Sequence, residues 1–138
     1  MFFNKQDENN PESNFVKIAA LLIYAAKIDE NYTHEEEKII RKTLLNLGVS
    51  EKNLDILIMN AKKFEENANQ ILDFTKEVKN LEEIDKIKIV RSLWRIIYSN
   101  KDADIYETNL MRRLAGLIYI DSKTMGDIKE EIKKENQQ

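Results

Sequence analysis

The chain has 138 residues, of which 42% are hydrophobic and 34% are charged, and its formal net charge is −3. This composition is typical of one folded helical domain and not of a disordered chain, and the acidic balance argues against a nucleic-acid duplex as a partner. The chain has no cysteine, which excludes disulfides and thiolate chemistry, and its three glycines and one proline are too few for the turns of a many-stranded sheet.

The first predicted helix runs from about Glu12 to Ile28. Its apolar residues recur at the spacing of one helix face, at Phe15, Ile18, Ala19, Leu22, Ile23 and Ala26. A second apolar edge at Leu21, Tyr24 and Ile28 predicts that this helix is buried on more than one side.

Capping signals mark the helices that follow. Thr33 with Glu36 forms the pattern of a capping box, and Gly48 supplies the left-handed residue that ends this second helix. Ser50 is predicted to cap a third helix, and a shorter fourth helix is expected at about Ala68–Val78.

A fifth helix is predicted to open with Asn80 and Glu83 and to continue to about Ser99. It leaves only a thin polar stripe, so we expect a second core helix. On one edge it carries Trp94 and Tyr98 at i, i+4 spacing, with Arg91 one turn before them. This edge fits either a recognition surface or core aromatics covered by an arginine stem.

Two further helices complete the pattern. Asp104 with Glu107 is predicted to start the sixth, and Asp121 is predicted to cap the seventh, with a narrow apolar stripe at Met125, Ile128 and Ile132.

The segment Asp29–Ser50 resembles the segment Asn100–Asp121 at a constant offset of 71 residues. Under this offset Glu36 falls on Glu107, and Arg41-Lys42 falls on Arg112-Arg113. Apolar, acidic and basic positions recur in register, so we infer that one helix–loop–helix hairpin is used twice.

The fold class is therefore predicted to be all-α, a single compact bundle of six or seven helices with two related hairpins. Residues 12–134 form the expected domain, between a flexible segment at residues 1–11 and a flexible tail at residues 135–138. The longest apolar run, Ile18–Ala26, is far shorter than the roughly 20 residues that cross a bilayer. The start Met1–Phe3 does not resemble a signal peptide, so we expect a cytoplasmic protein without a transmembrane segment.

Both repeated loops are rich in acidic residues. Crowded carboxylates repel one another unless a cation joins them, which favours a divalent cation such as calcium or magnesium. The candidate ligands are Asp29, Glu36, Asp104 and Glu107. Neither loop has the glycine or the final glutamate of an EF-hand. Helix capping accounts for the same residues without any metal, so both interpretations stay open.

The sequence contains no set of residues that requires catalysis. His34 is the only histidine, and neither a hydrolytic triad nor a zinc site can be assembled around it. It is expected to be an exposed residue of a first helical turn. Arg41-Lys42 and Arg112-Arg113 could hold an anion, or could pair with carboxylates on a charged helix surface.

With its two acidic loop–helix motifs, the chain resembles the TerB-like family of bacterial tellurite-resistance and stress proteins. Asp29 and Glu36 match the family's seven-residue spacing, and the second copy matches through Tyr106-Glu107 and Asn109-Leu110. The resemblance covers about Phe15 to Ile128. It implies a compact, non-catalytic helical module linked to tellurite or metal stress, with acidic loop residues as candidate cation ligands. A related domain occurs in membrane-anchored co-chaperones.

The function expected from the sequence is binding of a partner protein, with a weak divalent cation at the acidic loops. The alternative is a pure protein–protein adaptor or co-chaperone-like scaffold in which the acidic residues act only as helix caps. An enzyme would need a cleft that perturbs one of the carboxylates. The partner and the oligomeric state are left open by the sequence.

Overall fold

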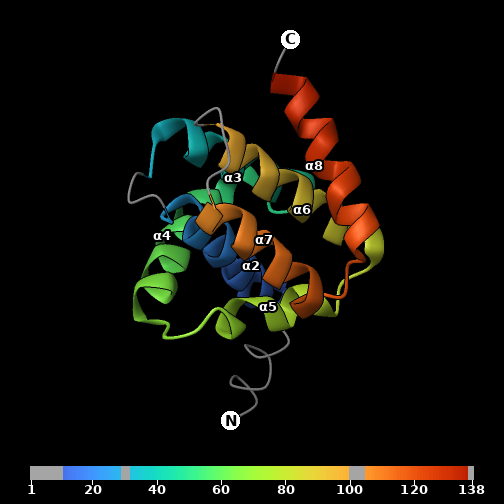
Figure 1. The fold of residues 1–138 in the computed structure, drawn as a ribbon. Coiled ribbons are helices and arrows are strands. Elements are labelled where there is room, and N and C mark those ends of the chain that lie inside the picture. The colour runs from blue at the N-terminus through green and yellow to red at the C-terminus, as the bar shows by residue number, and fades with distance from the viewer. Residues whose placement is uncertain (1–10, 29–31, 100–104, 137–138) are drawn as a thin grey trace.

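The computed structural model describes residues 11–28, 32–99 and 105–136 (Figure 1). This part of the chain is all-α, as predicted, and contains no strand. Its seven helices are α2 (Pro11–Ala26), α3 (His34–Asn46), α4 (Glu51–Asn67), α5 (Leu72–Lys79), α6 (Glu83–Tyr98), α7 (Ile105–Leu117) and α8 (Ser122–Asn136).

Helix α2 is the centre of the bundle. It packs against α3, α4, α5 and α6, and every residue from Ile18 to Ile23 is at most 1% exposed. In Figure 1 it runs through the middle of the molecule. The prediction that this helix is buried on more than one side is confirmed, because four other helices pack against it.

Helix α6 is the second core helix and packs against α2, α3 and α8. Trp94 and Tyr98 are 2% and 5% exposed and their rings stack with centroids 5.9 Å apart, which confirms that they are core aromatics. The predicted start of α6 was wrong. Asn80 has a helical backbone and is the C-cap of α5, whereas Glu82 has the extended backbone that an N-cap requires.

The fourth predicted helix begins later than expected. Ala68 has an extended backbone and forms the C-cap of α4, so α5 starts only at Leu72. The side chain of Asp73 accepts a 3.3 Å hydrogen bond from the amide of Gln70 and helps to turn the chain into α5. The predicted start was too early because Ala68 and Ile71 have helical apolar spacing although they lie in the loop before α5.

The repeat predicted from the sequence is present in the structure. Helices α3 and α7 both have 13 residues, and their first and last residues obey the same 71-residue offset. After each helix a residue with positive φ, Gly48 or Tyr119, reverses the chain. The amide of Val49 bonds to the carbonyl of Leu44, and that of Ile120 bonds to the carbonyl of Ala115, both at 3.0 Å. These are the bonds of a Schellman motif at equivalent places in the two halves.

The correspondence also includes the neighbouring helices. Helix α2 packs against α4, and the equivalent helix α6 packs against α8. The apolar stripe of α8, which the sequence left free to pack on its own domain or on a neighbour, is buried within the domain at Met125, Ile128 and Ile132. Figure 1 shows the C-terminal turns of α8 extending past the other helices. Glu135 and Asn136 belong to this helix, where Asn136 donates a 2.9 Å hydrogen bond to the carbonyl of Tyr98.

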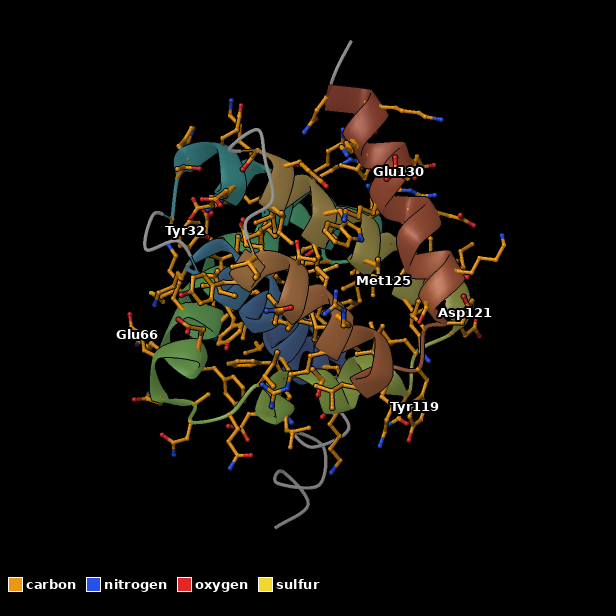
Figure 2. The ribbon with its side chains drawn as sticks, viewed as in Figure 1. Tyr32, Glu66, Tyr119, Asp121, Met125 and Glu130 are labelled. Carbon is orange, nitrogen blue, oxygen red and sulfur yellow. The ribbon has the colours of Figure 1, made fainter. Side chains whose placement is uncertain are left out.

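The equivalent caps Ser50 and Asp121 give a matched pair of variants. The Asp121 carboxylate accepts a 2.6 Å hydrogen bond from the Thr124 amide, which confirms the predicted cap, whereas Ser50 precedes α4 without a side-chain bond. Asp121 and Met125 are labelled at the start of α8 in Figure 2. Asp121→Ala is therefore expected to lower the melting temperature clearly more than Ser50→Ala.

The effect of Asp121→Ala should depend on pH. The amide of Thr124 donates to the ionised carboxylate and holds the pKa of Asp121 below its ordinary value of 3.8. The stabilising bond is therefore fully present above pH 3.8 and is lost as the pH falls through the lower folded-state pKa. Thermal melts of the wild type and of Asp121→Ala should converge in acid. A difference that persists or grows there would contradict the cap.

Candidate functional site

Of the four predicted cation ligands, two lie in the part of the chain that the structure describes. Glu36 and Glu107 occupy the first turns of α3 and α7 and are 1% and 5% exposed. Asp29 and Asp104 lie outside the described residues, as does the predicted capping role of Asp104. The repeat thus places a buried carboxylate at the same position in each half.

Glu36 completes the capping box predicted for α3. Its Oε1 accepts hydrogen bonds from the amide of Thr33 at 2.7 Å and from the Thr33 hydroxyl at 3.0 Å. In return, the Thr33 hydroxyl oxygen accepts a 3.1 Å hydrogen bond from the amide of Glu36. These bonds satisfy donors at the positive end of the helix, where a carboxylate is favoured. Capping is therefore one role of Glu36.

The adjacent Glu37 is neutralised by the protein itself. Its carboxylate lies 3.0 Å from Nζ of Lys62 on α4 and 3.5 Å from Nε of Arg41. Burial by itself raises the pKa of Glu37, but the hydrogen bond and charge of Lys62, followed by the charge of Arg41, lower the pKa to below its ordinary value. The crowding of acidic residues at the start of α3 is thus relieved in part by cations of the chain.

Tyr32 connects the first loop to this ion cluster. It lies just before α3 (Figure 2), and its hydroxyl donates a 3.2 Å hydrogen bond to Oε1 of Glu37. Nζ of Lys62 is 5.4 Å from the centroid of the Tyr32 ring. Burial, followed by the negative charge of Glu37, raises the pKa of Tyr32, so its hydroxyl stays protonated and remains a donor.

The carboxylate oxygens of Glu36 and Glu107 are of the type that calcium and magnesium prefer. Among residues 11–28, 32–99 and 105–136, however, no three aspartate, glutamate, histidine or cysteine side chains gather into a group that could hold a metal ion. The described residues therefore fit a cation only as partial donors.

The other candidate residues from the sequence, His34 and the basic pairs, lie on the surface of α3 and α7. His34 is an exposed residue of the first turn of α3, as predicted. Arg41 pairs with Asp55 at 2.7 Å as well as with Glu37, which supports surface ion pairing. Arg112 donates a 3.4 Å hydrogen bond to the side chain of Asn109.

The sequence reasoning did not find a groove of about 710 Å³ between α3, α6 and α8. Its lining includes the carboxylate of Glu135 and four basic side chains, which are Lys42, Lys88, Arg91 and Arg95. A signal was present in the sequence, because Arg91 and Arg95 are one helical turn apart and so are Glu131 and Glu135 on the last helix. Only the packing of α8 on α6 brings the two pairs together.

The family model for tellurite resistance protein TerB matches residues 15–130. The chain belongs to the TerB family. No curated protein and no solved structure gives a significant match to it. The matched range of this TerB-family chain includes both repeated hairpins and all four predicted cation ligands, and it ends within α8. In the part of the chain that the structure describes, no helix has the length and apolar character needed to cross a membrane.

Proposed function

We propose that this TerB-family chain is a non-catalytic binding module of the cytoplasmic stress response, of the tellurite- or metal-resistance type. It acts by binding a partner protein, and its two acidic loops hold a divalent cation weakly. The candidate ligands are Asp29 and Glu36 in the first hairpin and Asp104 and Glu107 in the second. A bound calcium or magnesium ion would supply positive charge that joins the carboxylates of each loop to the first turn of the next helix.

The observation that carries this proposal is the burial of Glu36 and Glu107, which are 1% and 5% exposed. A buried carboxylate is costly unless it is paired or bonded. A neutral glutamine would also serve in a capping box. The recurrence of a carboxylate at both equivalent positions therefore supports a use for the negative charge, both at the positive end of each helix and toward a cation.

The cation can be tested by adding calcium chloride or magnesium chloride to the ¹⁵N-labelled protein and following the amide shifts. Saturable shifts are expected near Glu36 and Glu107 at millimolar ion. In Glu36→Gln the first loop should lose its response and the second should keep it, while the free energy of unfolding falls by less than about 1 kcal/mol because glutamine still reaches the Thr33 amide.

Glu35→Gln is the matched control, since Glu35 is an exposed carboxylate of the same helical turn. It should leave the response of the first loop intact. Equal losses in the two variants would mean that the ions only screen surface charge, and the cation part of the proposal would be wrong. Absence of localised shifts in the wild type would lead to the same conclusion.

The second candidate function is a pure protein–protein adaptor. It is favoured by the capping bonds of Glu36 and by the neutralisation of Glu37 by Lys62 and Arg41. Under this function, Glu36→Gln keeps full affinity for whichever protein the wild type captures from its native cell. A folded Glu36→Gln variant that no longer captures that protein would favour the cation-dependent function instead.

A further inference from the structure

The groove between α3, α6 and α8 has the volume of a small-molecule site and a mainly polar and charged lining. Its volume of about 710 Å³ lies within the range of small-molecule pockets in proteins. Its wall on α6 carries Arg91 and Arg95, one helical turn apart. Nothing in the proposed function uses this groove.

Both arginines already hold oxyanions in a forked geometry. Nε and Nη2 of Arg95 lie 3.0 and 3.1 Å from the two carboxylate oxygens of Glu135. The same atoms of Arg91 lie 2.8 and 3.4 Å from the two oxygens of Glu131. A planar guanidinium that donates two bonds in this way is equally suited to a phosphate group. The carboxylates of α8 thus occupy positions that a ligand's oxyanions could take.

The lining contains more positive charge than these two glutamates neutralise. Lys42, on α3, is an exposed lysine that forms no ion pair among the described residues. The ammonium group of Lys88, on α6, pairs with Asp85 at the long distance of 3.8 Å. The pKa of Glu135 is lowered first by its hydrogen bond with Arg95 and also by the charges of Arg95, Lys42 and Arg91. Basic side chains from two helices therefore converge on one oxyanion position.

We infer that this groove binds a small ligand that bears adjacent phosphate groups, which displace Glu135, and then Glu131, from the arginine forks. The Cα atoms of residues four apart on a helix are separated by about 6 Å along its axis. Two linked phosphates can therefore offer a separate oxyanion group to each guanidinium group, whereas a single phosphate would have to be shared by both. Lys42 and Lys88 contribute charge from the sides of the groove.

The glutamates of α8 act as an internal competitor in this site. Both pairs are partly exposed, with side-chain exposures between 35% and 49%, so exchange for a ligand does not require the core to open. Such exposed pairs contribute little stability by themselves. The apolar contacts of Met125, Ile128 and Ile132 keep α8 in place while its charged edge is exchanged.

The test is an amide-shift titration of the full chain with pyrophosphate, with orthophosphate and citrate as comparison anions. Pyrophosphate is expected to shift amides of α3, α6 and α8 around the groove and to bind at least tenfold more tightly than either comparison anion. ATP then serves as a second phosphate source: affinity equal to that of pyrophosphate would show that only the phosphates are bound, and tighter binding would show that a nucleoside adds contacts. If citrate binds as tightly as pyrophosphate, or the shifts spread over all basic surfaces, the inference is wrong.

Substitutions distinguish a site from a general electrostatic effect. Arg95→Gln should weaken pyrophosphate binding at least tenfold, and Glu135→Gln should strengthen it several-fold because the competing charge is removed. Asp127→Asn is the control, since Asp127 is an exposed acid of α8 that pairs with Lys123 instead. It should leave the affinity unchanged. Strengthening by Asp127→Asn equal to that by Glu135→Gln would overturn the internal competition.

A further variant tests the groove without breaking the ion pairs that join α6 to α8. Lys42→Gln leaves both arginine–glutamate pairs intact and should still weaken pyrophosphate binding about threefold to fivefold. The chain has a single tryptophan, Trp94, whose ring centroid lies 5.5 Å from Nζ of Lys129 on α8, so its fluorescence reports whether α8 stays docked. Unchanged pyrophosphate affinity in a folded Lys42→Gln variant, together with unchanged affinity in Arg95→Gln, would exclude the groove.

Discussion

Phe74→Ala is expected to lower the free energy of unfolding by about 3–5 kcal/mol, the usual cost of deleting a fully buried aromatic ring. Phe74 is 1% exposed. Its ring centroid lies 5.6 Å from that of Tyr24 on α2 and 5.8 Å from that of Phe64 on α4. The eight-residue helix α5 is too short to be stable in isolation, so its position depends on this packing.

Urea unfolding followed by circular dichroism measures this effect. Leu72→Ala, on the same helix, is the matched control, because Leu72 is 50% exposed and should cost less than about 0.5 kcal/mol. Phe74→Leu should fall between the two, since it retains apolar volume but loses the ring contacts. Similar losses for Phe74→Ala and Leu72→Ala would contradict the position of α5 against α2 and α4.

Gly48→Ala is expected to lower the free energy of unfolding by about 1–2 kcal/mol. A Cβ atom at Gly48 would meet nothing within 4 Å, so the cost is not a steric clash with a neighbour. It arises from the backbone, because φ is 112° at Gly48, a conformation that residues with a Cβ rarely adopt. The variant should therefore be destabilised although no packing contact is lost.

Tyr119 occupies the equivalent position after α7 with φ of 61°, which a residue with a side chain can adopt at some cost. Its ring also lies near the ammonium groups of Lys79 and Lys86, with Nζ 5.6 and 5.8 Å from the ring centroid. Tyr119→Gly removes the cost of the positive φ but also loses the contacts with the two lysines. The two effects oppose each other, so the free energy of unfolding should change by less than about 1 kcal/mol. A loss in Tyr119→Gly as large as that in Gly48→Ala would show that the two turns are not equivalent.

The two proposals place opposite charges in different regions of this TerB-family protein. The acidic loops precede α3 and α7 and are proposed to use carboxylates. The groove between α3, α6 and α8 is proposed to use the basic side chains of Lys42, Lys88, Arg91 and Arg95.

Features that depend on near neighbours along the chain were predictable from the sequence. The capping box of Thr33 and Glu36, the left-handed Gly48 and the Asp121 cap each involve residues within a few positions of one another, and all three are confirmed. The prediction for Asn80 failed because the following residues turn once more before Glu82 reaches the extended backbone of an N-cap. Ser50 lies in the predicted place but forms no side-chain cap bond.

The amino-acid sequence by itself determined the helices and the two repeated hairpins, because helical periodicity and capping bonds act over three or four residues and recur at the 71-residue offset. The resemblance of the acidic motifs to the TerB family also came from the sequence alone. Only the tertiary structure decided which charges meet. Lys62 reaches Glu37 across α3 and α4, and Glu135 reaches Arg95 across α6 and α8. These distances depend on how the apolar faces of separate helices pack, and that packing decides which charged residues far apart in the chain meet.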